Sequence, residues 1–321
     1  MTNAESTFPR FKNKGGSNHC WFNSALQVII HALKGEPDLM ESNDFDIENN
    51  NDMDVDIISV GIAIFNAIQM FTTYPGIYDV GIKIKDPFDQ NTELPLKYLM
   101  LKQMHITAPV ELNQQHDVAQ CIEAMLPIVP KLSFLMHQTQ DQIKCNGPGC
   151  EYRHSVTNVI PITSIEISTT GKRSSDGKWK FSGKDAIKRY FQDTEHGIER
   201  ICDDCNTNVS SKQIKLFSSC KYIIIQFKRF VVTGNRTRKN NKETEPFSFV
   251  DIETLQGIER YEVVATIEHI GEEMKSGHYI SYIKRNNTWF QCNDTNIMPL
   301  ANDNTSPIKN SYIILLKKAI E

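Results

Sequence analysis

One stretch of the sequence, Gly-Gly-Ser-Asn-His-Cys-Trp-Phe-Asn-Ser-Ala-Leu-Gln (residues 15–27), places a cysteine directly before a helical pattern. Apolar side chains recur at positions 22, 25, 26, 29, 30 and 33, which is the spacing of a helix with one buried face. Gly35 and Pro37 end the pattern, because glycine terminates helices and proline cannot continue them. We therefore expect a helix over residues 21–33, with Cys20 at its N-terminus.

Cys20 is a candidate nucleophile because of this position. A thiol near neutral pH is mostly protonated, and both a helix N-terminus and a nearby imidazole favour the thiolate. Gly15 and Gly16 would let the backbone turn tightly and leave amide groups free to bind a developing oxyanion. The alternative is that Cys20 is a small buried hydrophobic residue at the start of a helix.

His278 is the candidate base, because thiolate attack on an amide needs a group that protonates the leaving amine. It begins an expected strand over residues 278–284, and Asn293 and Asp294 follow in the next segment. A strand, a turn and a second strand would return these residues to His278, where an amide or a carboxylate can fix the imidazole tautomer. A surface histidine followed by a polar turn has the same spacing, so that alternative stays open.

Four of the eight cysteines form two close pairs. Cys145 and Cys150 enclose a turn of sequence Asn-Gly-Pro-Gly, and Cys202 and Cys205 enclose two aspartates. Two such pairs supply four thiolates, the ligand set of a closed structural zinc site. In a reducing compartment such pairs suit a metal better than disulfides, and the alternative is four unrelated buried thiols. The spacing predicts one structural zinc ion and no organic cofactor.

The composition limits the class of protein. The chain has 321 residues, 40% hydrophobic content and a formal net charge of −4, so it can bury a sizeable core and has no broad basic surface for nucleic acid. The longest apolar run, residues 57–71, is interrupted by Asn66 and Gln69, and the first fifteen residues lack a secretory apolar segment. We expect a soluble protein of the cytoplasm or nucleus, with no membrane or nucleic-acid partner.

The pattern of the chain changes near residue 136. The first 135 residues are mainly helical in pattern, with further helices expected over residues 57–71 and 118–125. β-branched runs then predict strands at residues 156–167, 221–230, 261–267, 278–284 and 312–316. The segments 168–178 and 233–242 are rich in small and polar residues and are expected to be exposed loops. The fold class is α+β, with a helical lobe first and a sheet lobe last.

Residues 15–27 also resemble the cysteine box of ubiquitin-specific proteases, Asn-x-Gly-Asn-Thr-Cys-Tyr-x-Asn-Ser-x-Leu-Gln. Asn18, Cys20 and Asn23 match this box in register, as do the residues at 24, 26 and 27, while Trp21 replaces the tyrosine. The family usually has an oxyanion-hole asparagine five residues before the cysteine, and this chain has Gly15 there. The resemblance implies that Asn18 or backbone amides complete the oxyanion hole.

Residues 261–271, 277–279 and 289–294 resemble the histidine box of the same family. The resemblance implies that His278 is the base, that Asn293 orients it, and that the neighbouring Asp294 is a second candidate for that role. It gives His269 no catalytic part.

A further motif, residues 114–120, resembles the family's Gln-x-Asp-Ala-x-Glu. It implies that Gln115 and Asp117 bind the extended tail of ubiquitin, together with Gly277 and Tyr279 beside the histidine. Asp117 precedes a helical run, so it is also expected to be an N-cap, and both roles are compatible.

These resemblances imply a papain-like catalytic domain over residues 1–321. It would comprise a helical thumb at 1–135, zinc-tipped β fingers at 136–220 and a β palm at 221–321. The implied activity is deubiquitination through a Cys20 thioester, by a monomeric unit whose partner is ubiquitin or a ubiquitin-like protein. Three alternatives stay open: an inactive ubiquitin-binding scaffold, a papain-like enzyme of another class, and a zinc-ribbon interaction module.

Overall fold

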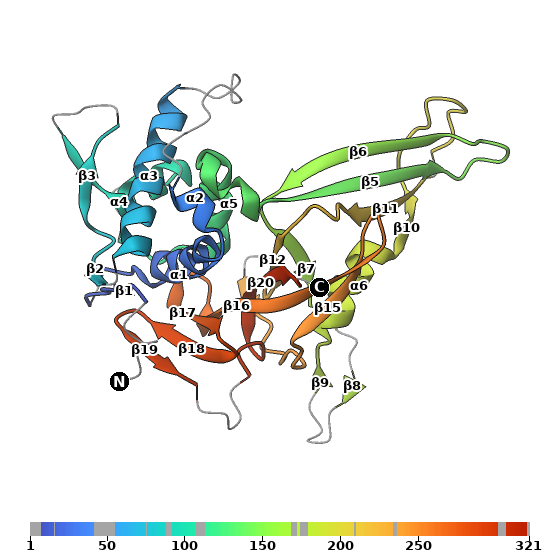
Figure 1. The fold of residues 1–321 in the computed structure, drawn as a ribbon. Coiled ribbons are helices and arrows are strands. Elements are labelled where there is room, and N and C mark those ends of the chain that lie inside the picture. The colour runs from blue at the N-terminus through green and yellow to red at the C-terminus, as the bar shows by residue number, and fades with distance from the viewer. Residues whose placement is uncertain are drawn as a thin grey trace.

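The computed structural model describes residues 8–15, 17–41, 55–74, 76–87, 92–106, 113–167, 172–173, 179–208, 210–233, 236–300 and 306–319. Helices α1 to α5 gather at one end of the molecule, a large sheet lies beside them, and a long hairpin reaches away on the far side (Figure 1). Among the described helices, none combines the length and the apolar character needed to cross a membrane. The α+β fold class is observed, with α1 to α5 before residue 129 and most strands after residue 136.

The helical lobe is built around α1 (Cys20–Lys34). Sequence periodicity predicted one buried face, but the helix is buried on nearly every side. The reason is its position, because α1 packs against α3, α5 and the sheet strand β17 at once. The other helices are α2 (Pro37–Glu41), α3 (Val55–Thr73), α4 (Leu96–Gln103), α5 (Val118–Ile128) and the 3-10 helix η3 (Pro130–Leu135).

Short strands border the helical lobe. β1 (Arg10–Phe11) pairs in parallel with β2 (Ile77–Tyr78), and β3 (Lys83–Lys85) pairs with β4 (Glu93–Pro95). The first of these pairs brings the segment before Cys20 beside residues that lie far along the chain.

The large sheet has eight strands in the order β19-β18-β17-β16-β20-β12-β7, with β15 paired to β16. β12 contains a buried apolar run, residues 222–225 with three consecutive isoleucines, as expected for a strand covered on both faces. The strands are β7 (Thr163–Glu166), β12 (Tyr222–Lys228), β15 (Phe249–Glu253), β16 (Ile258–Glu273), β17 (Ser276–Arg285), β18 (Thr288–Asn293), β19 (Asn296–Pro299) and β20 (Ser311–Lys318).

The finger sheet is a separate four-stranded sheet of order β10-β11-β5-β6. Its long hairpin projects away from the helices in Figure 1. The strands are β5 (His137–Cys145), β6 (Arg153–Ile160), β10 (Thr194–Ile198) and β11 (Ser210–Leu216).

Two features of the sheets differ from the sequence expectation. Residues 156–167 were expected as one strand, but they form β6 in the finger sheet and β7 in the large sheet, where β7 pairs in parallel with β12. Such a parallel pair needs a crossover, and α6 (Gly183–Gln192) lies within it and packs against β15. The short hairpin β8 (Lys172–Arg173) and β9 (Trp179–Lys180) precedes α6.

The segment 233–242 was expected as a loop, but part of it is a strand. β14 (Arg236–Lys239) pairs with β13 (Phe230–Thr233). Lys239 Nζ donates hydrogen bonds to the backbone carbonyls of His269 and Gly271, at 2.7 and 2.8 Å. This contact with β16, distant in sequence, fixes β14 although its composition is typical of a loop.

Candidate active site

The candidate nucleophile begins α1. Cys20 is the first residue of the helix, and His19 is its N-cap without a capping side-chain hydrogen bond of its own. Asn13 Oδ1 accepts from the backbone N–H of His19 itself at 2.9 Å and so holds the loop at the start of the helix. Cys20 is buried and hydrogen-bonds through its side chain to His278. The structure therefore brings together the two side chains that the sequence named as nucleophile and base.

The third group of the site comes from the end of the neighbouring strand. β17 carries His278, β18 pairs with it, and Asn293 is the last residue of β18. Asn293 Oδ1 lies 2.7 Å from His278 Nε2. Because an amide oxygen only accepts, Nε2 carries the proton in this contact and Nδ1 is the nitrogen left for the Cys20 thiol.

The surroundings of His278 favour its charged form. The hydrogen bond to Cys20 is the largest cause that raises the pKa of His278 to about 9, against the opposing effect of burial. The contact with Asn293 and the negative charge of Asp294 raise it further. Near neutral pH the imidazole therefore holds the proton that a leaving amine would need.

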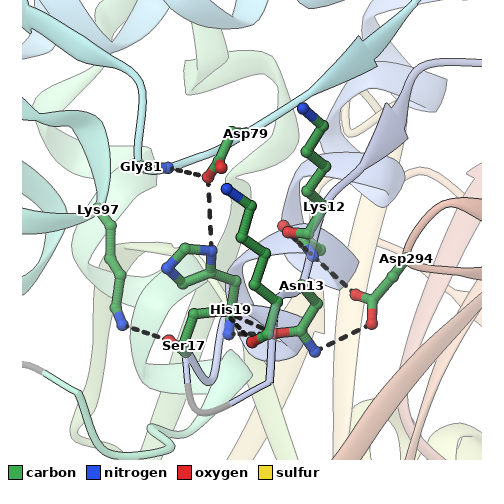
Figure 2. Close-up of polar contacts among 10 residues, drawn as sticks. Lys12, Asn13, Ser17, His19, Asp79, Gly81, Lys97 and Asp294 are labelled. Carbon is green, nitrogen blue, oxygen red and sulfur yellow. Dashed lines mark hydrogen bonds and ion pairs between the residues drawn. The ribbon is translucent and has the colours of Figure 1, made fainter.

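Asp294 acts as a tether rather than as the nearer partner of the imidazole. Its Oδ2 lies 3.9 Å from His278 Nε2. Asn23 Nδ2 on α1 donates to Asp294 Oδ1 at 2.7 Å, and Asn13 Nδ2 donates to Asp294 Oδ2 at 3.0 Å (Figure 2). Asp294 thus connects the loop before Cys20, the helix that follows it and the turn after β18. Sequence reasoning missed Asn13, whose only signal is its place shortly before the two glycines.

Gly15 and Asn18, the two residues that the sequence indicated for the oxyanion hole, have different contacts. Gly15 is exposed, and a Cβ built on it would have no atom within 4 Å. Asn18 Nδ2 donates to the backbone carbonyl of Asn113 at 2.6 Å, and Asn18 itself has a φ of +48°. Its amide therefore ties this loop to the segment that leads to Gln115. Gly16 lies outside the described residues.

The loop before Cys20 has two further contacts that the sequence did not indicate, through Lys97 and Asp79. Lys97 Nζ, from α4, donates to the backbone carbonyl of Ser17 at 2.8 Å. His19 Nδ1 lies 3.8 Å from Asp79 Oδ1, which also accepts from the backbone N–H of Gly81 at 2.9 Å. Figure 2 shows both contacts around the short loop. A lysine within an apolar helical pattern was the available sequence signal.

Gln115 and His269, both buried, contact each other near the site. Gln115 Nε2 lies 3.1 Å from His269 Nε2. Burial is the main cause that lowers the pKa of His269 to about 4, so this imidazole is neutral and its Nε2 can accept from the amide. Gly277 must be glycine here, because its φ is +141° and a Cβ would lie 2.3 Å from the Ile270 carbonyl oxygen.

Asp117 and Tyr279, which the sequence also indicated for tail binding, make contacts inside the protein. Asp117 Oδ1 accepts from the backbone N–H of Ala119 at 2.8 Å, which makes it the expected N-cap of α5. Its Oδ2 accepts from the hydroxyl of Tyr312 at 2.7 Å. The Tyr279 ring is buried between His269 and Tyr312. Both side chains are thus engaged within the protein.

The four paired cysteines form a compact cluster at the far end of the finger sheet. Their Sγ atoms all lie within 4.8 Å of one another, with Cys145 to Cys205 at 3.6 Å and Cys150 to Cys202 at 3.7 Å. Sulfurs around a tetrahedral ion with bonds of about 2.3 Å stand about 3.8 Å apart, so the cluster could hold one metal ion. All eight cysteines are free thiols.

The turn between the first two cysteines fits such a site. The backbone N–H of Gly147 points at Cys145 Sγ at 3.3 Å, and a Cβ on Gly147 would stand 3.0 Å from Cys205 Sγ. Gly149, with a φ of +74°, closes the same turn. The two glycines of the sequence motif therefore let the backbone approach the sulfurs closely.

Comparison with known proteins agrees with this arrangement. A family model described as ubiquitin carboxyl-terminal hydrolase matches residues 10–316. A probable ubiquitin carboxyl-terminal hydrolase of Acanthamoeba polyphaga mimivirus is 30% identical over 144 residues, which are 40% of this chain and 30% of the relative. Ubiquitin carboxyl-terminal hydrolase 17-like protein B of Mus musculus is 27% identical over 190 residues, 54% of this chain and 36% of the relative. The chain thus spans about a third of the length of these relatives.

The fold also matches solved structures. The SAGA Ubp8/Sgf11/Sus1/Sgf73 DUB module bound to ubiquitin aldehyde contains a chain that aligns with a TM-score of 0.66 at 16% identity. The alignment covers 100% of this chain and 71% of that chain, and at this identity it shows the shared fold. With a family model that matches nearly its whole length, the chain belongs to the ubiquitin carboxyl-terminal hydrolase family.

Proposed function

We propose that the protein is a deubiquitinating cysteine protease that hydrolyses the bond after the C-terminal glycine of ubiquitin. The observation that carries this proposal is the placement of His278 between the Cys20 thiol and the amide of Asn293. A thiol, an imidazole and an orienting amide in this order form the arrangement that cysteine proteases use for acyl transfer.

In the proposed mechanism, the Cys20 thiolate attacks the carbonyl carbon of the terminal glycine. The carbon–nitrogen bond to the departing lysine amine then breaks while His278 gives that nitrogen its proton. A thioester to Cys20 remains. His278 next takes a proton from water, the resulting hydroxide attacks the thioester, and the Cys20 thiolate leaves. Asn293 holds the imidazole in the required tautomer throughout.

The tail of ubiquitin is proposed to pass beside Gln115 and Gly277. Gln115 contacts His269, and His269 lies close to Gly277. Any side chain on residue 277 would clash with the Ile270 carbonyl oxygen and with His269. Asp117 and Tyr279 are proposed to support this surface from behind, because their side chains are engaged with Ala119, Tyr312 and His269. The substrate is ubiquitin or a ubiquitin-like protein with a similar tail.

The metal is proposed to be one structural zinc ion held by Cys145, Cys150, Cys202 and Cys205. The spacing of the four sulfurs and the two close glycines support this choice. Four thiolates would occupy all four coordination positions of a tetrahedral zinc ion. The ion would therefore stabilise the finger sheet and take no part in the cleavage. We also propose that the protein acts as a monomer in the cytoplasm or nucleus, where free thiols persist.

The function is tested with two fluorogenic substrates. One carries the fluorophore on the C-terminus of intact ubiquitin, and the other carries it on a short peptide with the same last residues. The proposal predicts release from ubiquitin at a kcat/KM far above that for the peptide. Equal release from both would point to a general protease instead.

One observation favours a second candidate, a ubiquitin-binding scaffold without turnover. Gly15 offers no side chain to an oxyanion, and the amide of Asn18 is already bonded to Asn113. A scaffold would bind ubiquitin with an affinity that Cys20→Ala leaves unchanged, and it would release no fluorophore. Turnover that disappears in Cys20→Ala excludes it.

A further inference from the structure

A buried cation stands beside the loop in which Gly15 contributes no side chain. Lys97 lies in the first turn of α4 and is 2% exposed. Its neighbours on the helix, Leu96, Leu99 and Met100, are fully buried apolar residues. Its Nζ reaches the loop and donates to the Ser17 carbonyl at 2.8 Å (Figure 2).

The position of Lys97 is unfavourable for a charge. An ammonium group carries three N–H donors, and burying it costs free energy unless an anion or several acceptors compensate. In the part of the chain that the structure describes, Lys97 donates to a neutral carbonyl, and no carboxylate forms an ion pair with it. An apolar side chain would fill this core position without that cost. Departures from such packing rules concentrate at functional sites.

Lys97 interacts electrostatically with Cys20. Burial lowers the pKa of Lys97 to about 8, and negative charge on Cys20 acts in the opposite direction and raises it. An ammonium group near a thiol favours the thiolate form. Lys97 is also the second cause, after burial, that lowers the pKa of His19. The imidazole directly before Cys20 is therefore kept neutral.

We propose that Lys97 is a positioning residue for the thiol chemistry of Cys20. Through the Ser17 carbonyl it orients the loop that leads into α1, and its charge favours the thiolate. The use of the thiolate in cleavage rests on the proposed function, whereas the effect of the charge on the thiol does not.

The experiment measures the rate at which iodoacetamide alkylates Cys20 as a function of pH, with Cys20 identified by peptide mass. Lys97→Gln removes the charge but keeps a donor for the Ser17 carbonyl. Lys97→Met removes both and introduces no buried polar group. Lys97→Arg keeps charge and donor, and Lys102→Met alters an exposed lysine of the same helix as the matched control. His278 and Tyr279, which interact with Cys20, and the neighbouring His19, Asp79 and Asp294 are unchanged in every variant.

The midpoint of the alkylation curve should rise by about one pH unit in Lys97→Gln and Lys97→Met, the order of shift produced by removal of a nearby opposite charge. Lys97→Arg and Lys102→Met should keep the wild-type midpoint. A purely structural lysine would change the melting temperature without moving the midpoint. An unmoved midpoint in either folded neutral variant therefore overturns the inference.

Ubiquitin hydrolysis by the same samples separates this inference from the proposed function. A shifted alkylation curve without hydrolysis by the wild-type protein contradicts the proposed function and leaves the role of Lys97 standing. Hydrolysis by the wild-type protein together with an unshifted curve in the neutral variants overturns the role of Lys97 alone.

Discussion

Cys20 and the four clustered cysteines of the finger sheet carry the same thiol group in opposite surroundings. Cys20 contacts an imidazole that an amide holds in place, and it interacts electrostatically with a buried ammonium. The four clustered thiols meet mainly one another. A thiol with a base as partner can do acyl transfer, whereas four thiols that face one another suit a closed metal site.

The two sites also differ in what holds them in place. Cys20 belongs to the large hydrophobic core that joins the helical lobe to the sheet. The described core clusters contain none of the four clustered cysteines. The end of the finger sheet therefore depends on its local contacts and on any ion it binds, while the position of Cys20 depends on the packing of α1. Loss of the Cys20 thiol should therefore leave the finger sheet intact, and loss of the metal should leave Cys20 reactive.

The largest expected effect follows from removing the Cys20 thiol. Cys20→Ala should lower kcat for ubiquitin hydrolysis by at least about 10⁴-fold, because no other group can form the thioester. Binding of ubiquitin and the metal content should stay at wild-type levels. Cys121→Ala, which alters another buried thiol in the same core, should retain activity. Wild-type turnover in Cys20→Ala would contradict the assignment of the nucleophile.

The next effect concerns the other site. Cys202→Ala, or removal of the metal with a chelator, should cost more than about 4 kcal/mol in the free energy of unfolding of the finger sheet, the range reached when a structural metal is lost. Metal analysis should give one zinc per chain for the wild-type protein and for Cys20→Ala. Alkylation of Cys20 should persist in Cys202→Ala. Loss of the thiol reactivity together with the metal would remove the separation between the two sites.

The smallest effect is a change in titration. The pKa of His278 in the folded protein, about 9, lies above its ordinary value of 6.5. The imidazolium therefore adds stability that is fully present below pH 6.5 and is lost as pH rises through 9. In Cys20→Ala, NMR titration should show the His278 midpoint falling toward 6.5, because the hydrogen bond to Cys20 is the main cause of the shift.

His137 provides the internal control for that titration. Burial alone lowers its pKa to about 4, and its Nε2 is bonded to Thr163 Oγ1 at 2.7 Å in a different part of the fold. Its midpoint should not move in Cys20→Ala. An unchanged His278 midpoint would mean that the thiol and the imidazole do not interact in solution.

Much of the fold could be predicted from local sequence patterns. The α+β class and the family are confirmed, and the four paired cysteines lie together as their spacing implied. Helix periodicity correctly predicted α1, and β-branched runs correctly predicted β12, β17 and β20. The boundaries of thumb, fingers and palm stay predictions, although β7 and α6 associate with the large sheet from within the predicted fingers. A parallel crossover of this kind leaves no local signal.

The parts of the site that escaped prediction all depend on long-range contacts. Asn13 hydrogen-bonds to Asp294, which lies 281 residues away in the sequence. Lys97 on α4 hydrogen-bonds to the backbone carbonyl of Ser17 in the loop before α1. Nothing in the periodicity around either residue indicates its partner. Cys20, His278 and Asn293 could be named because they stand in motifs with a recognisable register, whereas Asn13 and Lys97 have no motif of their own.

The central claim is that Cys20 is a thiol nucleophile directed at the C-terminus of ubiquitin. It is tested most directly with a ubiquitin probe whose C-terminal glycine is replaced by an electrophile. We expect one covalent adduct per chain, mapped to Cys20 by peptide mass, at a rate that falls strongly when the tail of the probe is offered without the ubiquitin domain. If the folded, metal-loaded protein forms no adduct, or forms it at another cysteine, Cys20 is not a nucleophile directed at ubiquitin.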